Sequence, residues 1–466
     1  MRQVDVAIIG AGSTGLTAFS EVSRTTENVV IIEQGVGGTT CARVGCMPSK
    51  VMIQIAEDLH RGEYLATEGI RGGENLRLDM SQAMTHVRQL RDRFVRAVMG
   101  GTVTKAGDRY LKGRARFLEP GVLDVDGQTI RADKVIIATG SRPIVPPELE
   151  SLPVPVYTSD TIFEQDHFPA SMAVLGVGVI GLELGQALAR MGVQVTAFGR
   201  SGRIAGITDS DLNDYAVKQF RHEMEVHFDP NIRIEAVPNE RKARLHWKDQ
   251  TLEVGAILAA QGRTPNVEDL GLEKIGVPLD EKGIPQFDPQ TMQVGDLPIF
   301  IGGDVTGDLP VLHEASDEGR IAGYNAVNPV RPFQRKTPLA VVFTDPNIAQ
   351  VGQSYRQLEG QGTSFAIGEV SFEGQGRSLV MGRNRGLLRV YGEASSGKLL
   401  GAELMGPGGE HMAHELAWAI QLNLSVFDML KLPFYHPVVE EGLRTALRDL
   451  AYKIDREQAR WELDFA

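Results

Sequence analysis

The chain has 466 residues, with 48 basic and 60 acidic side chains and a formal net charge of −12. The acidic balance, without a stripe of Lys and Arg, argues against a dedicated nucleic-acid binder, and no apolar run approaches the roughly 18 residues of a membrane span. No signal peptide is visible, and two cysteines cannot form a disulfide framework in a chain of this length. We therefore expect a cytoplasmic protein.

The first 33 residues predict one β-α-β unit. A buried strand is expected at 4–9, a glycine turn of the form G-x-G-x-x-G at 10–15, a helix to about Arg24, and a second strand at 29–32 that ends at Glu33. Such glycines allow a tight turn and close approach of a pyrophosphate, which the helix N-terminus then faces. The order of these features predicts a dinucleotide site. Its expected contacts are Gly10, Gly12, Ser13, Thr14, Gly15 and Glu33.

Two cysteines follow the first unit, at Cys41 and Cys46. On a regular helix their Cα atoms would lie about 8.7 Å apart, whereas a disulfide needs less than about 7 Å. The pair can close only if the backbone is distorted, which Gly45 could permit, and such a bridge should be easy to reduce. We interpret the pair as redox-active rather than as two core cysteines. Two thiols alone leave a metal incompletely coordinated, so no metal site is expected.

A second β-α-β unit is predicted at 172–198. It comprises a strand at 172–175, a glycine turn at 176–181, a helix at 182–191 and a strand at 193–198. Two such units indicate two dinucleotides, and the economical pair is a flavin and a nicotinamide dinucleotide. The expected contacts of the second unit are Gly176, Gly178, Ile180 and Gly181.

The two units differ at the residue that follows the second strand. Glu33 lies 33 − 10 = 23 residues after Gly10, and the matching residue of the second unit is Gly199, which Arg200 follows. A carboxylate accepts hydrogen bonds from a ribose hydroxyl, whereas an arginine accommodates a 2′-phosphate. We therefore expect FAD in the first unit and NADP(H), favoured over NAD(H), in the second. The alternative is that Arg200 and Arg203 are solvated loop charges.

The C-terminal part predicts strands at 387–391 and 399–404, joined by a turn at 394–397, and then two helices, at 410–422 and 439–452. The pair His411 and His414 has metal-ligand spacing but no third ligand, and is interpreted as a coincidence of the helix face.

The segment 37–50, GGTTCARVGCMPSK, resembles the redox signature of the pyridine nucleotide–disulfide oxidoreductases. The resemblance covers essentially the whole chain. It includes the crossing segment VIIATGSRP at 135–143, the return segment QGRTPN at 261–266, IGGDV at 301–305, and the closing His-Pro-x-x-x-Glu at 436–441. Within the family the chain is most similar to the dihydrolipoamide dehydrogenases.

The resemblance implies an α/β fold with two Rossmann-like dinucleotide-binding domains and a C-terminal α+β dimerisation domain. The implied boundaries are 1–143 for the FAD domain, 144–264 for the NAD(P) domain, 265–336 for the return of the FAD domain and 337–466 for the interface domain. A homodimer is implied, because in this family the closing histidine reaches the active site of the other subunit.

The resemblance also implies residue roles. Cys46 would lie on the flavin, Cys41 would exchange with the substrate, and Lys50 with Glu183 would stabilise the reduced flavin. His436 would act as the base, with Glu441 holding its tautomer and Glu440 as the alternative partner. Further cofactor contacts are expected at Gly38, Thr39, Thr40, Lys50, Ala115, Thr139, Gly140, Asp304, Arg200, Gly262 and Arg263.

Three features depart from the dihydrolipoamide dehydrogenases or their relatives. Arg200 resembles the glutathione and mercuric reductases, Phe434-Tyr435 replaces a histidine and a small residue before His436, and the chain ends without the cysteine pair of a mercuric reductase. The resemblance still implies FAD-dependent electron transfer between NAD(P)H and a dithiol/disulfide substrate, a small disulfide or a lipoyl domain, most like that of a dihydrolipoamide dehydrogenase. The alternatives are an NADPH-dependent reductase of another disulfide or a metal ion, and a redox-inactive member of the fold.

Overall fold

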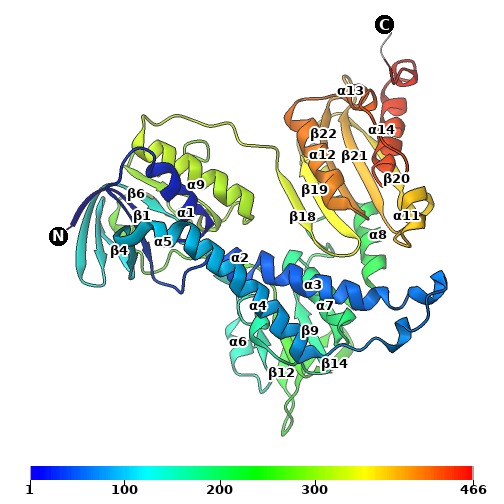
Figure 1. Ribbon diagram of the computed structural model, residues 1–466, viewed down its shortest axis with the longest axis horizontal. Coiled ribbons are helices and arrows are strands. Elements are labelled where there is room, and N and C mark those ends of the chain that lie inside the picture. The colour runs from blue at the N-terminus through cyan, green and yellow to red at the C-terminus, as the bar shows by residue number, and fades with distance from the viewer. Residues whose placement is uncertain (1, 464–466) are drawn as a thin grey trace.

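The computed structural model describes residues 2–463 as three lobes, with long helices running from the N-terminal to the middle lobe and an extended segment leading to the C-terminal lobe (Figure 1). An N-terminal lobe holds the first glycine turn, a middle lobe holds the second, and a C-terminal lobe follows. No helix in the described range is both long enough and apolar enough to cross a membrane.

The N-terminal lobe is built on a seven-stranded sheet in the order β3-β2-β1-β6-β5-β4, with β17 also paired to β6. Its strands are β1 (Arg2–Ile9), β2 (Val29–Glu33), β3 (Tyr110–Lys112), β4 (Ala115–Glu119), β5 (Val122–Val125), β6 (Gln128–Ile137) and β17 (Ile299–Ile301). Helices α1 (Ser13–Val22) and α9 (Leu312–Val327) pack against each other in this lobe. The predicted β-α-β unit is confirmed, and its helix ends two residues before Arg24.

The middle lobe holds a parallel five-stranded sheet in the order β11-β10-β9-β15-β8. Its strands are β8 (Val156–Tyr157), β9 (Ser171–Leu175), β10 (Gln194–Gly199), β11 (Glu225–Phe228) and β15 (Ala256–Ala259). A small antiparallel sheet adds β12 (Arg233–Ala236), β13 (Ala243–Trp247) and β14 (Gln250–Val254). The helices are α6 (Pro147–Glu150), α7 (Val179–Arg190) and α8 (Ser210–Phe220). Because Gly178 is the N-cap, α7 begins three residues before the expected Leu182.

Three helices from the N-terminal part of the sequence extend toward the middle lobe, and the first two of them carry Cys41 and Cys46. These are α2 (Thr40–Val44), α3 (Cys46–Arg61) and α4 (Met80–Val98), and α5 (Thr104–Ala106) leads back to the sheet. Met52 and Met84, both fully buried, share one hydrophobic core with Leu182 and Leu188 of α7. The antiparallel pair β7 (Ser141–Pro143) and β16 (Arg263–Pro265) marks where the chain crosses between the two lobes.

The C-terminal lobe is an antiparallel sheet in the order β18-β19-β22-β21-β20. Its strands are β18 (Leu339–Val342), β19 (Asn347–Gly352), β20 (Phe365–Ser371), β21 (Leu387–Glu393) and β22 (Leu399–Gly406). Its helices are α10 (Tyr355–Gly360), α11 (Gly376–Val380), α12 (Gly409–Gln421), α13 (Val426–Leu430) and α14 (Glu441–Ile454). The predicted hairpin of two strands is confirmed as β21 and β22.

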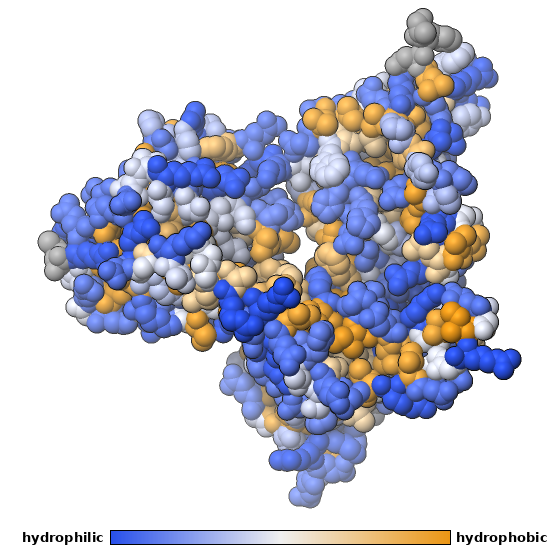
Figure 2. All heavy atoms as spheres, viewed as in Figure 1, coloured by the Kyte–Doolittle hydropathy of each residue, from blue (hydrophilic) through white to orange (hydrophobic). Residues whose placement is uncertain are grey.

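Apolar side chains gather on the outer face of the C-terminal lobe near α12 and α13 (Figure 2). Trp418 is 64% exposed, Leu422 69% and Tyr435 81%. An apolar face of this kind is typical of a surface that another protein chain covers.

Candidate active site

The glycine turn of the N-terminal lobe leaves room for a phosphate beside the first turn of α1. A side chain at Gly10, where φ is +104°, would meet the carbonyl oxygen of Ala138 at 2.2 Å, and one at Gly15 would meet the carbonyl oxygen of Gly10 at 1.9 Å. At Gly12 nothing lies within 4 Å of an added Cβ. Strand and helix therefore approach closely around the two outer glycines, while the middle glycine faces open space.

The turn of the middle lobe repeats this geometry. A Cβ at Gly176 would meet the carbonyl oxygen of Ala260 at 2.2 Å, one at Gly181 would meet Gly176 at 1.9 Å, and Gly178 faces open space. Neither α1 nor α7 has a side-chain cap at its N-terminus. Ser13, Thr14 and Ile180 lie in these first helical turns. Both turns therefore fit the pyrophosphate of a dinucleotide, which would accept hydrogen bonds from backbone N–H groups.

Glu33 lies at the end of β2, beside the first turn. Its carboxylate accepts hydrogen bonds from the backbone N–H of Ala11 at 2.8 Å and of Gly35 at 2.5 Å. Ala115, at the start of β4, is 4% exposed and belongs to the core of the lobe. The loop from Gly38 leads to α2, where the Thr39 hydroxyl accepts a hydrogen bond from Ala42 N at 3.2 Å.

Three segments that are distant in sequence meet at the crossing between the lobes. Arg263 Nε donates to Ser141 Oγ at 2.8 Å, and Ser141 Oγ donates to Asp304 Oδ2, also at 2.8 Å. Thr139 Oγ1 donates to the carbonyl oxygen of Asn266 at 2.7 Å. These contacts hold Asp304 beside the crossing strands, whose flanking glycines are Gly140 and Gly262, both at positive φ.

Gly199, at the end of β10, is enclosed by two side chains. An added Cβ would lie 2.5 Å from Val177 Cγ2 and 2.9 Å from Phe228 Cδ1. The space that an acidic side chain would need is therefore already filled. Arg200 and Arg203 follow on the surface, and within residues 2–463 neither forms an ion pair.

A break between two helices brings the cysteines together. Gly45, with φ −125° and ψ −118°, ends α2, and Cys46 begins α3. Both cysteines are free thiols, and the Cys41 thiol forms a hydrogen bond with that of Cys46. This hydrogen bond, helped by the positive charge of Lys50, lowers the pKa of Cys46 to about 7. The same hydrogen bond and burial raise the pKa of Cys41. Cys46 is thus the thiol that ionises first.

Lys50 lies one turn beyond Cys46 on α3 and reaches two other lobes. Its Nζ is 2.8 Å from Glu183 Oε2 on α7 and 4.5 Å from the centre of the Phe343 ring. Glu183, only 4% exposed, also accepts a hydrogen bond from the backbone N–H of Phe343 at 2.8 Å. A fixed positive charge therefore lies beside the two thiols.

The histidine of the closing motif lies on the C-terminal lobe, between α13 and α14. His436 Nδ1 is 2.9 Å from Glu441 Oε1, and this contact lowers the pKa of Glu441. Glu441, rather than the alternative Glu440, therefore orients the ring. The His436 side chain is 80% exposed, and α14 lies well apart from α2 in Figure 1. The fold does not bring this histidine to the cysteines of its own chain.

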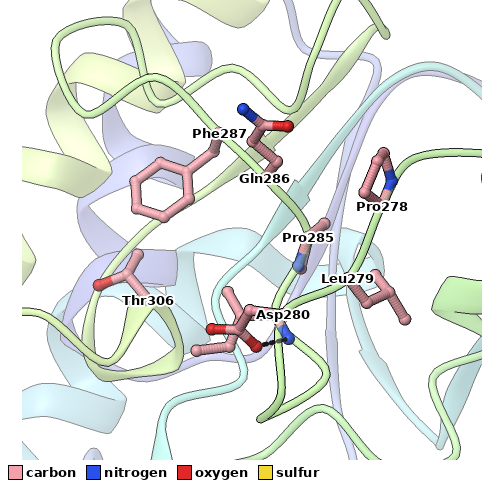
Figure 3. Close-up of a pocket in the computed structure, with 8 residues that line it drawn as sticks. Pro278, Leu279, Asp280, Pro285, Gln286, Phe287 and Thr306 are labelled. Atoms are coloured by element: carbon pink, nitrogen blue, oxygen red, sulfur yellow. Dashed lines mark hydrogen bonds between the residues drawn. The ribbon is translucent and has the colours of Figure 1, made fainter.

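A cavity of about 420 Å³ on the N-terminal lobe is lined by none of these residues (Figure 3). Its one carboxylate, Asp280, already accepts hydrogen bonds from the backbone of its own turn, at Lys282 and Ile284. The cavity therefore offers no free charged group for redox chemistry. The described residues hold no group of three or more His, Cys, Asp or Glu side chains that could bind a metal.

The sequence reasoning missed three side chains that lie around the Lys50–Glu183 pair or farther along the helix of Glu183. Phe343 packs on Lys50, and Gln186 and Arg190 follow Glu183 along one face of α7. The sequence did contain a signal for Gln186 and Arg190. Together with Glu183 they form a polar stripe with helical spacing on an otherwise apolar helix.

Comparisons with known proteins match most of the chain. The pyridine nucleotide-disulphide oxidoreductase family matches residues 4–319, and the dimerisation domain of the same family matches residues 339–447. A dihydrolipoyl dehydrogenase from Thermus scotoductus is 30% identical, over 97% of this chain and 98% of its own. A mercuric reductase from Staphylococcus aureus is 27% identical, over 95% of this chain and 81% of its own.

The fold also matches solved structures. The Cu(II) complex of RclA, an HOCl-induced flavoprotein disulfide reductase from Escherichia coli, superposes with a TM-score of 0.82 at 23% identity. The match covers 96% of this chain and 99% of the RclA chain. At this identity the likeness shows a shared fold.

Proposed function

Because the chain belongs to the pyridine nucleotide-disulphide oxidoreductase family, and so is an FAD-dependent disulfide oxidoreductase, we propose that it moves electrons between NADP(H) and a disulfide substrate through Cys41 and Cys46. The observation that carries the proposal is the break at Gly45, which pairs the two thiols beside the ammonium group of Lys50. The Cys46 thiolate, held next to this cation, is the form that can attack the sulfur of Cys41 in a mixed disulfide with the substrate.

Bound FAD would carry the electrons between the nicotinamide and the cysteine pair. In disulfide reduction, Cys41 attacks one substrate sulfur, which forms a mixed disulfide and releases the first substrate thiol. Cys46 then attacks the sulfur of Cys41, which releases the second thiol and leaves a Cys41–Cys46 disulfide. We assign the proton transfers of both steps to His436 of the partner subunit, oriented by that subunit's glutamate.

The enzyme is further proposed to act as a cytoplasmic homodimer. The chain carries the dimerisation domain of the family, which supports a homodimer. His436 and the apolar face around Trp418 are exposed in the single chain, and a second copy of the chain could cover both, which also supports a homodimer.

The preference for NADP(H) predicts a measurable difference between the two nicotinamides. In an anaerobic titration, we expect NADPH to reduce the flavin at lower concentration than NADH does. Substitution of both Arg200 and Arg203 by alanine should raise the KM for NADPH about ten-fold to a hundred-fold, because charge-assisted bonds to a phosphate are lost. The KM for NADH should stay nearly unchanged. A wild-type protein that NADH reduces better than NADPH would refute the preference.

The enclosure of Gly199 predicts that an acidic residue alone cannot convert the site to NAD(H). Gly199→Glu should lower the free energy of unfolding by about 1–3 kcal/mol, since Val177 and Phe228 must move to admit a side chain. Thermal unfolding measures this loss. Adding Phe228→Ala should recover part of the stability of Gly199→Glu. If Gly199→Glu unfolds at the wild-type temperature, the enclosure does not restrict this position.

The substrate is proposed to be the dithiol/disulfide couple of a lipoyl group, dihydrolipoamide and lipoamide or the same group on a lipoyl domain, as the name of the relative from Thermus scotoductus suggests. A second candidate is an NADPH-dependent reductase of another disulfide or of a metal ion, which the free Arg200 and Arg203 favour and a mercuric reductase relative supports. Turnover of dihydrolipoamide, oxidised glutathione and Hg(II) by the same preparation separates the two. Colourless protein that neither nicotinamide reduces would reject both.

A further inference from the structure

Three polar side chains of α7 are buried against the start of the C-terminal lobe. Glu183 is 4% exposed, Gln186 5%, and the side chain of Arg190 3%. Their spacing of three and four residues places them on one face of the helix. Buried polar groups of this kind are held by hydrogen bonds, and all three here bind the same short segment, residues 343–345.

Gln186 holds the backbone of Asp345 from both sides. Its Oε1 accepts from Asp345 N at 2.9 Å, and its Nε2 donates to Asp345 O at 2.9 Å. Arg190 adds a bond from Nη2 to the same carbonyl at 3.2 Å and an ion pair of 3.1 Å to the Asp345 carboxylate. Glu223 holds the guanidinium of Arg190 from the other side at 2.6 Å. The position of Asp345 is therefore determined by the helix.

The segment held in this way reaches the redox pair through Phe343. Glu183 binds Phe343 N, and the Phe343 ring packs on the ammonium group of Lys50, which Glu183 also binds. Lys50, one helical turn beyond Cys46, acts on this thiol through its positive charge. A shift of Asp345 would thus move Phe343, whose ring packs on Lys50 and whose backbone N–H binds the Glu183 carboxylate that also holds Lys50.

We propose that Gln186 and Arg190 are positioning residues for the redox pair: by fixing the segment 343–345 of the C-terminal lobe, they hold Lys50 at the distance from Cys46 that favours the thiolate. The inference rests on the proposed roles of Cys46 and Lys50. If Gln186 and Arg190 act in this way, the C-terminal lobe, which carries the dimerisation domain, contributes to the ionisation of Cys46 through the segment 343–345.

The expected readout is the pKa of Cys46. Three groups act on this thiol within the described chain: Cys41 on α2, Lys50 on α3 and Glu183 on α7. Lys50 favours the thiolate, and its loss or displacement must raise the pKa of Cys46. Because the chain has two cysteines only, Cys41→Ser leaves Cys46 as the single thiol, and the serine hydroxyl can still donate a hydrogen bond to it.

The test compares variants of the FAD-bound enzyme in the Cys41→Ser background, by the pH dependence of alkylation with iodoacetamide. Gln186→Met, which keeps the volume and removes both bonds to Asp345, should raise the pKa of Cys46 by about half a unit. Lys50→Gln gives the full rise in the pKa of Cys46 that follows when the positive charge is removed. Tyr391→Phe is the matched control, because it removes another buried bond between the same lobes, from Tyr391 to Asp209 at 3.1 Å. The pH profile of alkylation of Tyr391→Phe in the Cys41→Ser background should match that of Cys41→Ser alone.

Gln186→Met with the same alkylation profile as Tyr391→Phe would overturn the inference. If Gln186→Met fails to fold, Arg190→Lys tests the same point, since it keeps the charge and loses the bond to the carbonyl of Asp345. A shifted profile in a protein whose wild type reduces no disulfide would reject the proposed function and leave the positioning role standing.

Discussion

Replacement of Cys46 by serine is expected to reduce disulfide turnover by on the order of 10³-fold or more, because no other thiol can complete the exchange. The reduced enzyme should also lose its long-wavelength absorbance, since the thiolate beside the flavin is gone. Steady-state rates with a disulfide substrate and an anaerobic spectrum measure the two effects. The lowered pKa of Cys46, about 7, places its thiolate within the working pH range.

Cys41→Ser is the control that separates the two thiols. It should abolish turnover as well, because the substrate can no longer form a mixed disulfide, but it should keep the long-wavelength absorbance, which depends on Cys46. If the absorbance survives in Cys46→Ser and disappears in Cys41→Ser, the roles of the two cysteines are exchanged. Survival of turnover in Cys46→Ser would exclude the cysteine pair as the redox centre.

Substitution of His436 by alanine is expected to lower disulfide turnover by about 10²–10⁴-fold, the range for loss of a general acid or base. Reduction of a dye that takes electrons from the flavin should stay near the wild-type rate, since no thiol takes part. Steady-state assays with the two acceptors measure the difference. Glu441 orients the ring at 2.9 Å, so Glu441→Gln should show an intermediate loss.

A mixed dimer tests whether His436 acts across the subunit boundary. Neither Cys46→Ser nor His436→Ala should be active alone. A dimer with one subunit of each kind should regain turnover, because one of its two sites then combines an intact cysteine pair with an intact histidine. Failure of every mixed dimer to regain turnover would show that the histidine serves its own chain or another role.

Short sequence patterns were sufficient to predict the two glycine turns, the close pair of cysteines and the hairpin of the C-terminal lobe. Their signals are spacings within one short segment, such as the glycines at 10–15 and 176–181. A close approach of strand and helix requires glycine wherever it occurs, as the Cβ positions at Gly10 and Gly176 show. The start of α7 was less well predicted, because the helix begins after the N-cap Gly178, inside the segment 176–181 that was assigned to the turn.

The sequence by itself therefore determined the family, the two glycine turns and the close spacing of Cys41 and Cys46, because the motifs that show them are residues close together along the chain. Only the tertiary structure decided which distant side chains support them. Gln186 and Asp345, for example, are 159 positions apart along the chain. The enclosure of Gly199 by Phe228 is likewise a contact between separate strands. Such contacts depend on how distant segments pack, and no spacing along the chain encodes them.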